Sequence, residues 1–198
     1  MKNLIKVMVL GVFVMALFTS CAKQPTQESN DAKAAVEAAA KEGAGVYAAD
    51  EFKKLNDDLT AAMDEVNTQS KKFFKSYGTA KQMLANVKTE AEALAATIPA
   101  KKEAAKNAAV TAQQEAQSAI DEAKALLEKA PKGKGTKADI EAMKADLKGL
   151  EDSFPQIQAG IDQEDYFGAA NTANTIKEKA VAISDQVKAA IEKVKGKK

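Results

Sequence analysis

Apolar residues recur in alternating steps of three and four along most of the chain, and this spacing constrains the fold more than any other feature. One such series consists of Phe52, Leu55, Leu59, Ala62 and Val66. In a helix of about 3.6 residues per turn these positions form one continuous stripe, whereas a half-buried strand needs strict alternation, which no segment shows. The chain is also rich in Ala, Lys, Glu, Gln and Leu, which favour helix. The sequence therefore predicts an all-α fold.

Successive stripes predict an elongated helical bundle of five or six amphipathic helices. We expect a first helical unit over residues 31–98 and a second over 99–198, with Pro99 at the boundary between two helices. Shifted by 88 or 89 positions, the apolar residues of the first unit fall on those of the second, and Tyr77 falls on Tyr166. This pattern favours a duplicated three-helix unit. Because any two amphipathic stretches can be aligned by their stripes, an unduplicated bundle is the alternative.

The first residues have the layout of a secretion signal. Lys2 and Lys6 form a charged start, the apolar run 7–18 follows, and small polar residues then lead to Cys21. That run is shorter than the ~20 residues that a helix needs to cross a bilayer. We therefore expect a signal peptide over residues 1–20 and a flexible tether over residues 21–30, which are polar and lack periodicity.

The segment Leu17-Phe18-Thr19-Ser20-Cys21 resembles the lipobox of bacterial lipoproteins, with Phe18 where a Leu is usual. The resemblance implies that Cys21 is lipidated and becomes the first residue of the mature protein. Ala22 follows the cysteine and is compatible with sorting to the outer membrane. The expected location is thus the bacterial cell envelope, on the periplasmic face of the outer membrane. An ordinary signal peptide with an incidental cysteine is the alternative.

A second resemblance covers residues 31–94. The run from Glu42 to Phe52, Glu-Gly-Ala-Gly-Val-Tyr-Ala-Ala-Asp-Glu-Phe, is similar to the alanine-rich helical domain of many Gram-negative lipoproteins, with Ala49 where a Pro is usual. That family has no assigned catalytic activity. The resemblance therefore implies a helical fold and supplies no functional residues.

Composition argues against several classes of function. The chain has no His, and all 29 basic residues are Lys, for a net charge of +1. His is the usual general base and the commonest metal ligand, and Arg is the residue that binds phosphates through two parallel hydrogen bonds. We therefore expect no enzyme activity, no cofactor, no metal site and no nucleic-acid partner.

Two groups of residues are candidate contact sites. Phe73, Phe74 and Tyr77 form the densest aromatic group, and we expect them to pack in the core at a helix junction, with a partner-binding patch as the alternative. The second group is Lys193, Lys195, Lys197 and Lys198. These cations offset a helix dipole or contact an anionic envelope polymer.

The function expected from these features is non-catalytic. A lipid-anchored helical protein can act as scaffold, spacer or adaptor in the cell envelope, with the membrane as its first partner. One alternative is a helical binding module for a partner protein or ligand, which a large apolar pocket would favour. Another is a tether to peptidoglycan through the C-terminal lysines.

Overall fold

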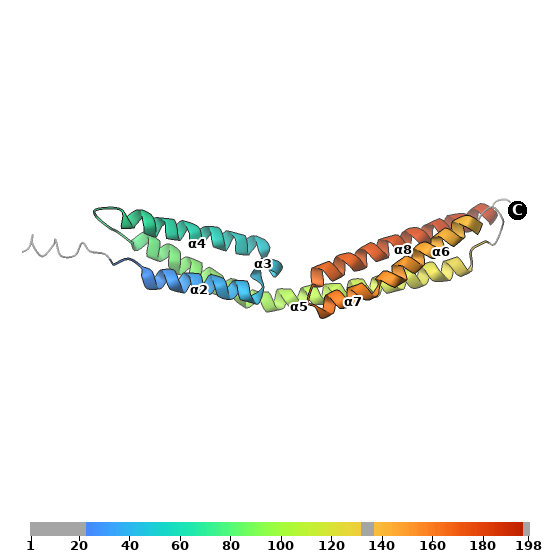
Figure 1. The fold of residues 1–198 in the computed structure, drawn as a ribbon, viewed down its shortest axis with the longest axis horizontal. Helices are drawn as coiled ribbons and strands as arrows, with labels where there is room; N and C mark the ends of the chain where they lie inside the picture. Colours follow the sequence, from blue (N-terminus) through green and yellow to red (C-terminus); the bar gives the residue numbers. More distant parts are fainter. Residues whose placement is uncertain (1–22, 132–136, 196–198) are drawn as a thin grey trace, which may run out of the picture. The chain divides into compact units, whose positions relative to one another are not determined.

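The computed structural model describes residues 23–131 and 137–195, and every regular element in these ranges is an α-helix (Figure 1). The all-α prediction is therefore confirmed. The chain divides into two compact units between Lys101 and Lys102. The helix α5, Gly78–Glu128, contributes its first part to the first unit and its second part to the second.

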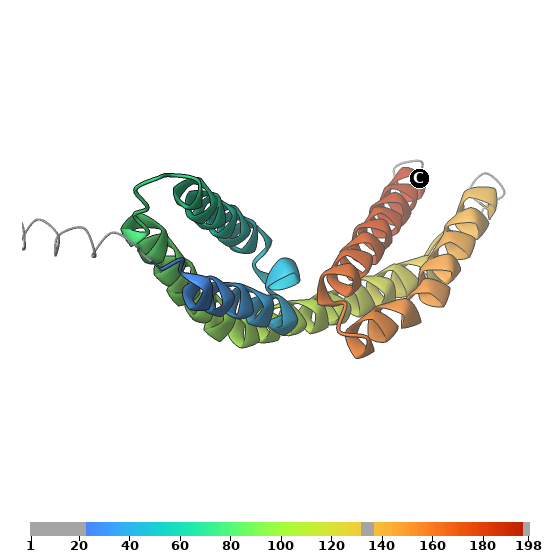
Figure 2. The same cartoon turned by 60° about the vertical axis from the view of Figure 1, so that its left-hand side comes forward.

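The first unit packs α2 (Thr26–Glu42), α4 (Ala49–Ser70) and the first part of α5 side by side, with the short α3 (Ala44–Tyr47) joining α2 to α4 (Figures 1 and 2). The apolar stripes of the three long segments face one another. The main core consists of Ala32, Val36, Leu55, Ala62, Val66, Tyr77, Ala80, Leu84, Val87 and Ala91. Most of these residues are Ala or Val, so the helices pack closely around a thin core.

The helix α2 begins earlier than its sequence predicts. We expected a flexible tether up to Asn30, yet residues 26–30 belong to α2 and Pro25 precedes its first residue. The side chain of Pro25 is fully buried, and the Ser29 hydroxyl donates a hydrogen bond of 2.7 Å to the Pro25 carbonyl. Packing of this first turn therefore overrides the polar composition that argued for a tether.

Two connections of the first unit follow from local sequence. Gly43 ends α2 with φ of 100°, a left-handed conformation that glycine adopts without steric cost. The sequence left open whether Ser76-Tyr77-Gly78 is a turn or an irregularity in one long helix. Because α4 ends at Ser70 and α5 begins at Gly78, residues 71–77 are a loop.

The expected helix boundary at Pro99 is wrong, since α5 continues through this residue. Pro99 itself lies on the exposed side of the helix. The preceding Ile98 is 1% exposed and packs with Ala39, Ala44 and Ala48. This packing holds the helical conformation that the proline disfavours.

The second unit combines the second part of α5 with α6 (Lys137–Ser153), α7 (Pro155–Asp162) and α8 (Tyr166–Lys195), and both α6 and α7 pack on α8. Pro155 separates α6 from α7, as its missing N–H and fixed φ favour the first turn of a new helix. The Asp165 carboxylate accepts a hydrogen bond of 3.0 Å from the Gly168 N–H and so caps α8.

The two units bury their last helix in the same register. In the first unit one series of buried or half-buried positions starts at Tyr77, just before α5, and continues through Ala80, Leu84, Val87, Ala91, Leu94 and Ile98. In the second they are Tyr166, Ala169, Ala173, Ile176, Ala180, Ile183 and Val187, each 89 positions after its counterpart. An unbroken register over seven positions supports a common three-helix plan for both units.

Candidate functional site

Cys21, the residue predicted to carry lipid, lies outside the described residues. The structure begins two positions later, at Lys23, and α2 starts at Thr26. A chain extends by at most about 3.6 Å per residue, so the four residue-to-residue steps from Cys21 to Pro25 span at most ~14 Å. Chain length alone therefore limits how far position 21 can lie from the end of the first unit at which α2 begins.

The structure separates the three aromatic candidates. Tyr77 is 3% exposed and belongs to the core, as expected. Phe73 and Phe74 are 92% and 74% exposed, so the expectation that they pack in the core is wrong. Their rings contact each other edge to face, with centroids 5.0 Å apart. The loop between α4 and α5 thus carries an exposed aromatic pair, whereas Tyr77, three residues before Ala80, continues the apolar stripe of α5 into the core.

The C-terminal lysines are described only in part. Lys193 lies on α8 and is exposed, whereas the side chain of Lys195 and all of Lys197 and Lys198 lie outside the described residues. Lys193 is close to the end of α8, where a cation interacts favourably with the helix dipole.

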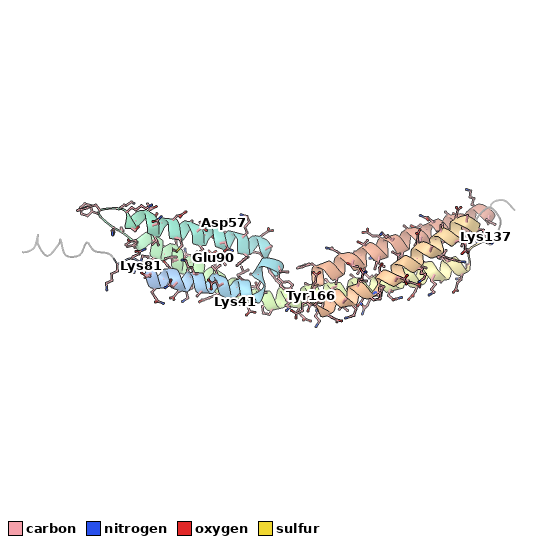
Figure 3. The ribbon with its side chains drawn as sticks, in the orientation of Figure 1. Lys41, Asp57, Lys81, Glu90, Lys137 and Tyr166 are labelled. Carbon is pink, nitrogen blue, oxygen red and sulfur yellow. The ribbon has the colours of Figure 1, made fainter. Side chains whose placement is uncertain are left out.

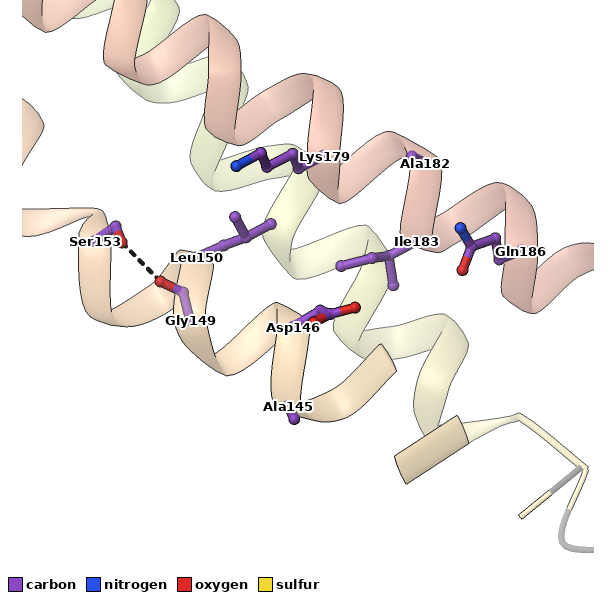
Figure 4. A pocket seen from close by; sticks show the side chains of 9 residues that line it. All are labelled: Ala145, Asp146, Gly149, Leu150, Ser153, Lys179, Ala182, Ile183 and Gln186. Carbon is purple, nitrogen blue, oxygen red and sulfur yellow. Dashed lines mark hydrogen bonds between the residues drawn. The ribbon is translucent and has the colours of Figure 1, made fainter. Parts of the chain in front are cut away.

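A surface hollow of about 530 Å³ lies between α6 and α8 and is open to solvent (Figure 4). Leu150 and Ile183 extend into the space between the two helices, while Asp146, Lys179 and Gln186 lie along its edges. These residues come from helices far apart in sequence, so no motif could have predicted them. The lining combines one acid, one base and the polar side chains of Ser153 and Gln186 with apolar residues, which does not match the largely apolar interior of a ligand pocket.

A second hollow of about 450 Å³ lies between α4 and α5 in the first unit. Two ion pairs cross it: Lys101 Nζ lies 2.6 Å from Glu51 Oε1, and Lys54 Nζ lies 3.5 Å from Glu90 Oε2. The hydrogen bond from Lys101 lowers the pKa of the Glu51 carboxyl. Each acid in this groove already has a lysine partner. The two ion pairs therefore link α4 to α5 across the groove.

In both units further ion pairs link one helix to another. Lys81 pairs with Glu28 at 2.8 Å in the first unit, and Lys177 pairs with Glu115 at 2.7 Å in the second. Other charged side chains, including Lys41 and Asp57, lie on exposed faces (Figure 3). Exposed pairs of this kind contribute little stability individually, about 0–1 kcal/mol, but they define which helix faces are solvated.

Within residues 23–131 and 137–195 we find no group of three or more side chains suited to hold a metal ion. In the same ranges none of the helices has the length and apolar character to cross a bilayer. The Ser184 hydroxyl on α8 is the one buried side-chain polar atom of the described part that lacks a hydrogen-bond partner.

Comparison of the chain with protein-family models, with curated protein sequences and with solved structures gave no match.

Proposed function

We propose that this chain is a lipid-anchored protein of the bacterial cell envelope, attached through Cys21, that acts as a non-catalytic scaffold, spacer or adaptor. The observation that carries the proposal is the leader itself: a charged start, a short apolar run and small residues end at the only cysteine of the chain. The fold supports the proposal because a firmly packed helix begins only five positions after that cysteine.

The helical units suit a spacer. In the first unit, α4 has 22 residues, which at about 1.5 Å per residue gives a rod of ~33 Å. The cores are filled by apolar side chains, and ion pairs fasten helix to helix around them. Such a bundle keeps its length and presents long solvated faces to partners, as a scaffold requires.

Two other functions find less support. A ligand-binding module needs an enclosed and mainly apolar pocket, whereas the hollow between α6 and α8 is open and edged by Asp146 and Lys179. A peptidoglycan tether needs the C-terminal lysines, and of these only Lys193 has a described side chain, which is exposed. Deleting residues 193–198 and measuring salt-sensitive binding to isolated cell wall tests the tether. Undiminished binding after the deletion would exclude it.

Membrane fractionation tests the anchor. Cys21→Ser removes the sulfur to which lipid is attached, so the protein should leave the membrane fraction on washing with alkaline carbonate. Ser20→Ala is the matched control because it keeps a small residue before the cysteine, and this variant should stay membrane-bound. Retention of Cys21→Ser through the wash would mean that something other than Cys21 holds the protein.

A further inference from the structure

The loop between α4 and α5 exposes an apolar pair that the fold does not use. Phe73 is 92% exposed and Phe74 is 74% exposed, and each ring has the other as its aromatic neighbour. Burying aromatic surface is favourable, and a folded chain in water gains nothing by presenting two large rings at the tip of a loop. Tyr77, four residues after Phe73, shows that the same loop can turn an aromatic ring into the core. The exposed pair therefore fits a surface outside this chain.

The charge around the pair indicates what kind of surface this is. Lys71, Lys72 and Lys75 flank the two phenylalanines and are exposed, and none of them joins an ion pair within the described residues. Between Val66 and Thr89 the chain has five lysines and no acidic residue. Two of these five, Lys81 and Lys88, pair with Glu28 and Asp31 of α2. The positive charge beside the aromatic pair therefore comes from Lys71, Lys72 and Lys75, and it is suited to an anionic partner.

The loop also lies at the end of the first unit where α2 begins. The salt bridge of 2.8 Å between Lys81 and Glu28 joins the first turn of α5 to the first turn of α2. Figure 1 shows the 71–77 loop and the start of α2 at the same end of this unit, with α3 at the opposite end. Because Cys21 is within ~14 Å of Pro25, a lipid on Cys21 would bring this end of the unit to the membrane surface.

We propose that the loop 71–77 is a second membrane contact, in which Phe73 and Phe74 enter the interface of an anionic bilayer while Lys71, Lys72 and Lys75 meet lipid phosphates. The inference rests on the proposed anchor for its geometry, since the lipid on Cys21 places the loop at the bilayer. Aromatic side chains partition into the region between headgroups and acyl chains, and basic residues beside them are attracted to anionic lipid. Two contacts at one end fix how the first unit stands on the membrane.

A single tryptophan tests the contact directly, because the chain contains no Trp. The full chain with Phe73→Trp is produced in a bacterium that lipidates exported proteins and is reconstituted into vesicles of phosphatidylethanolamine and phosphatidylglycerol. The expected result is an emission shift to shorter wavelength and strong quenching by lipids brominated on their acyl chains. Val46→Trp is the matched control, since Val46 is 61% exposed on α3 at the other end of the unit and should remain unquenched.

Charge and anchor are tested separately in the same system. Replacing Lys71, Lys72 and Lys75 with Gln, or the phosphatidylglycerol with phosphatidylcholine, should lower the quenched fraction severalfold, and added salt should act in the same direction. The intact mass of each preparation reports whether Cys21 is acylated. If the Phe73→Trp protein is acylated and its tryptophan stays unquenched, the loop contact is overturned and the anchor stands. Unacylated protein overturns the anchor, and quenching in added vesicles then decides the loop contact alone. A spectral shift without quenching indicates that protein, such as a second copy of this chain, covers the ring, and it also overturns the inference.

Discussion

Leu84→Ala tests whether the apolar stripes form the core that holds the first unit together. Leu84 is 0% exposed on α5, among core residues contributed by α2 and α4. The substitution removes three carbon atoms, which costs ~2.4 kcal/mol at about 0.8 kcal/mol for each buried methylene. The cavity adds to this cost because nearby residues such as Ala80 and Ala91 are too short to fill it. We expect the free energy of unfolding of the first unit to fall by about 3 kcal/mol.

Urea denaturation followed by circular dichroism, together with amide hydrogen exchange to separate the two units, measures this loss. Val46→Ala is the control, because it removes methyl groups from a side chain that is 61% exposed and should change the free energy of unfolding by less than about 0.5 kcal/mol. A loss below about 1 kcal/mol for Leu84→Ala, or equal losses for the two variants, would refute the assignment of buried and exposed faces.

Three further predictions concern backbone and charge. Gly43→Ala should lower the free energy of unfolding by about 1–2 kcal/mol, because residue 43 has φ of 100°. Gly149→Ala should raise it by up to about 1 kcal/mol, because nothing lies within 4 Å of the added carbon and Ala favours helix over Gly. Thermal melts compare the two variants. Pro99→Ala should raise the free energy of unfolding by up to about 3 kcal/mol in urea titrations, because it restores a helix N–H and removes a ring clash, and an unchanged midpoint would contradict this account of α5. The hydrogen bond from Lys81 lowers the pKa of Glu28, so this pair stabilises the fold above the ordinary carboxyl pKa and the stabilisation is lost as pH falls through the lowered value. Lys81→Gln should therefore raise the Glu28 pKa in an NMR titration, and an unmoved pKa would show that the pair does not form in solution.

Much of the fold was predictable because the helices are amphipathic and their stripes are long. Leu55, Ala62 and Val66 belong to the stripe that the sequence spacing predicts, and all three are buried. Leu59 is only half-buried, because it packs at the edge of the core rather than within it. The limits of the helices were harder to predict, as tertiary packing extends α2 back to Thr26 and carries α5 through Pro99.

The candidate site was less predictable, because exposure in a loop has no periodic signal. Phe73, Phe74 and Tyr77 were grouped by proximity in sequence, yet only Tyr77 continues the stripe of α5 and reaches the core. The hollows could not be predicted, since each is assembled from helices that meet only in the folded chain. The leader and Cys21 were read from sequence and remain a prediction outside the described residues.

The most direct test of the central claim is mass spectrometry of the amino-terminal peptide of the protein isolated from membranes. If the account is right, the mature chain begins at Cys21 and the peptide carries two or three acyl chains on that residue. A mature chain that begins at any other residue, or that begins at Cys21 without acyl groups, would contradict the proposal that lipid on Cys21 anchors this helical protein.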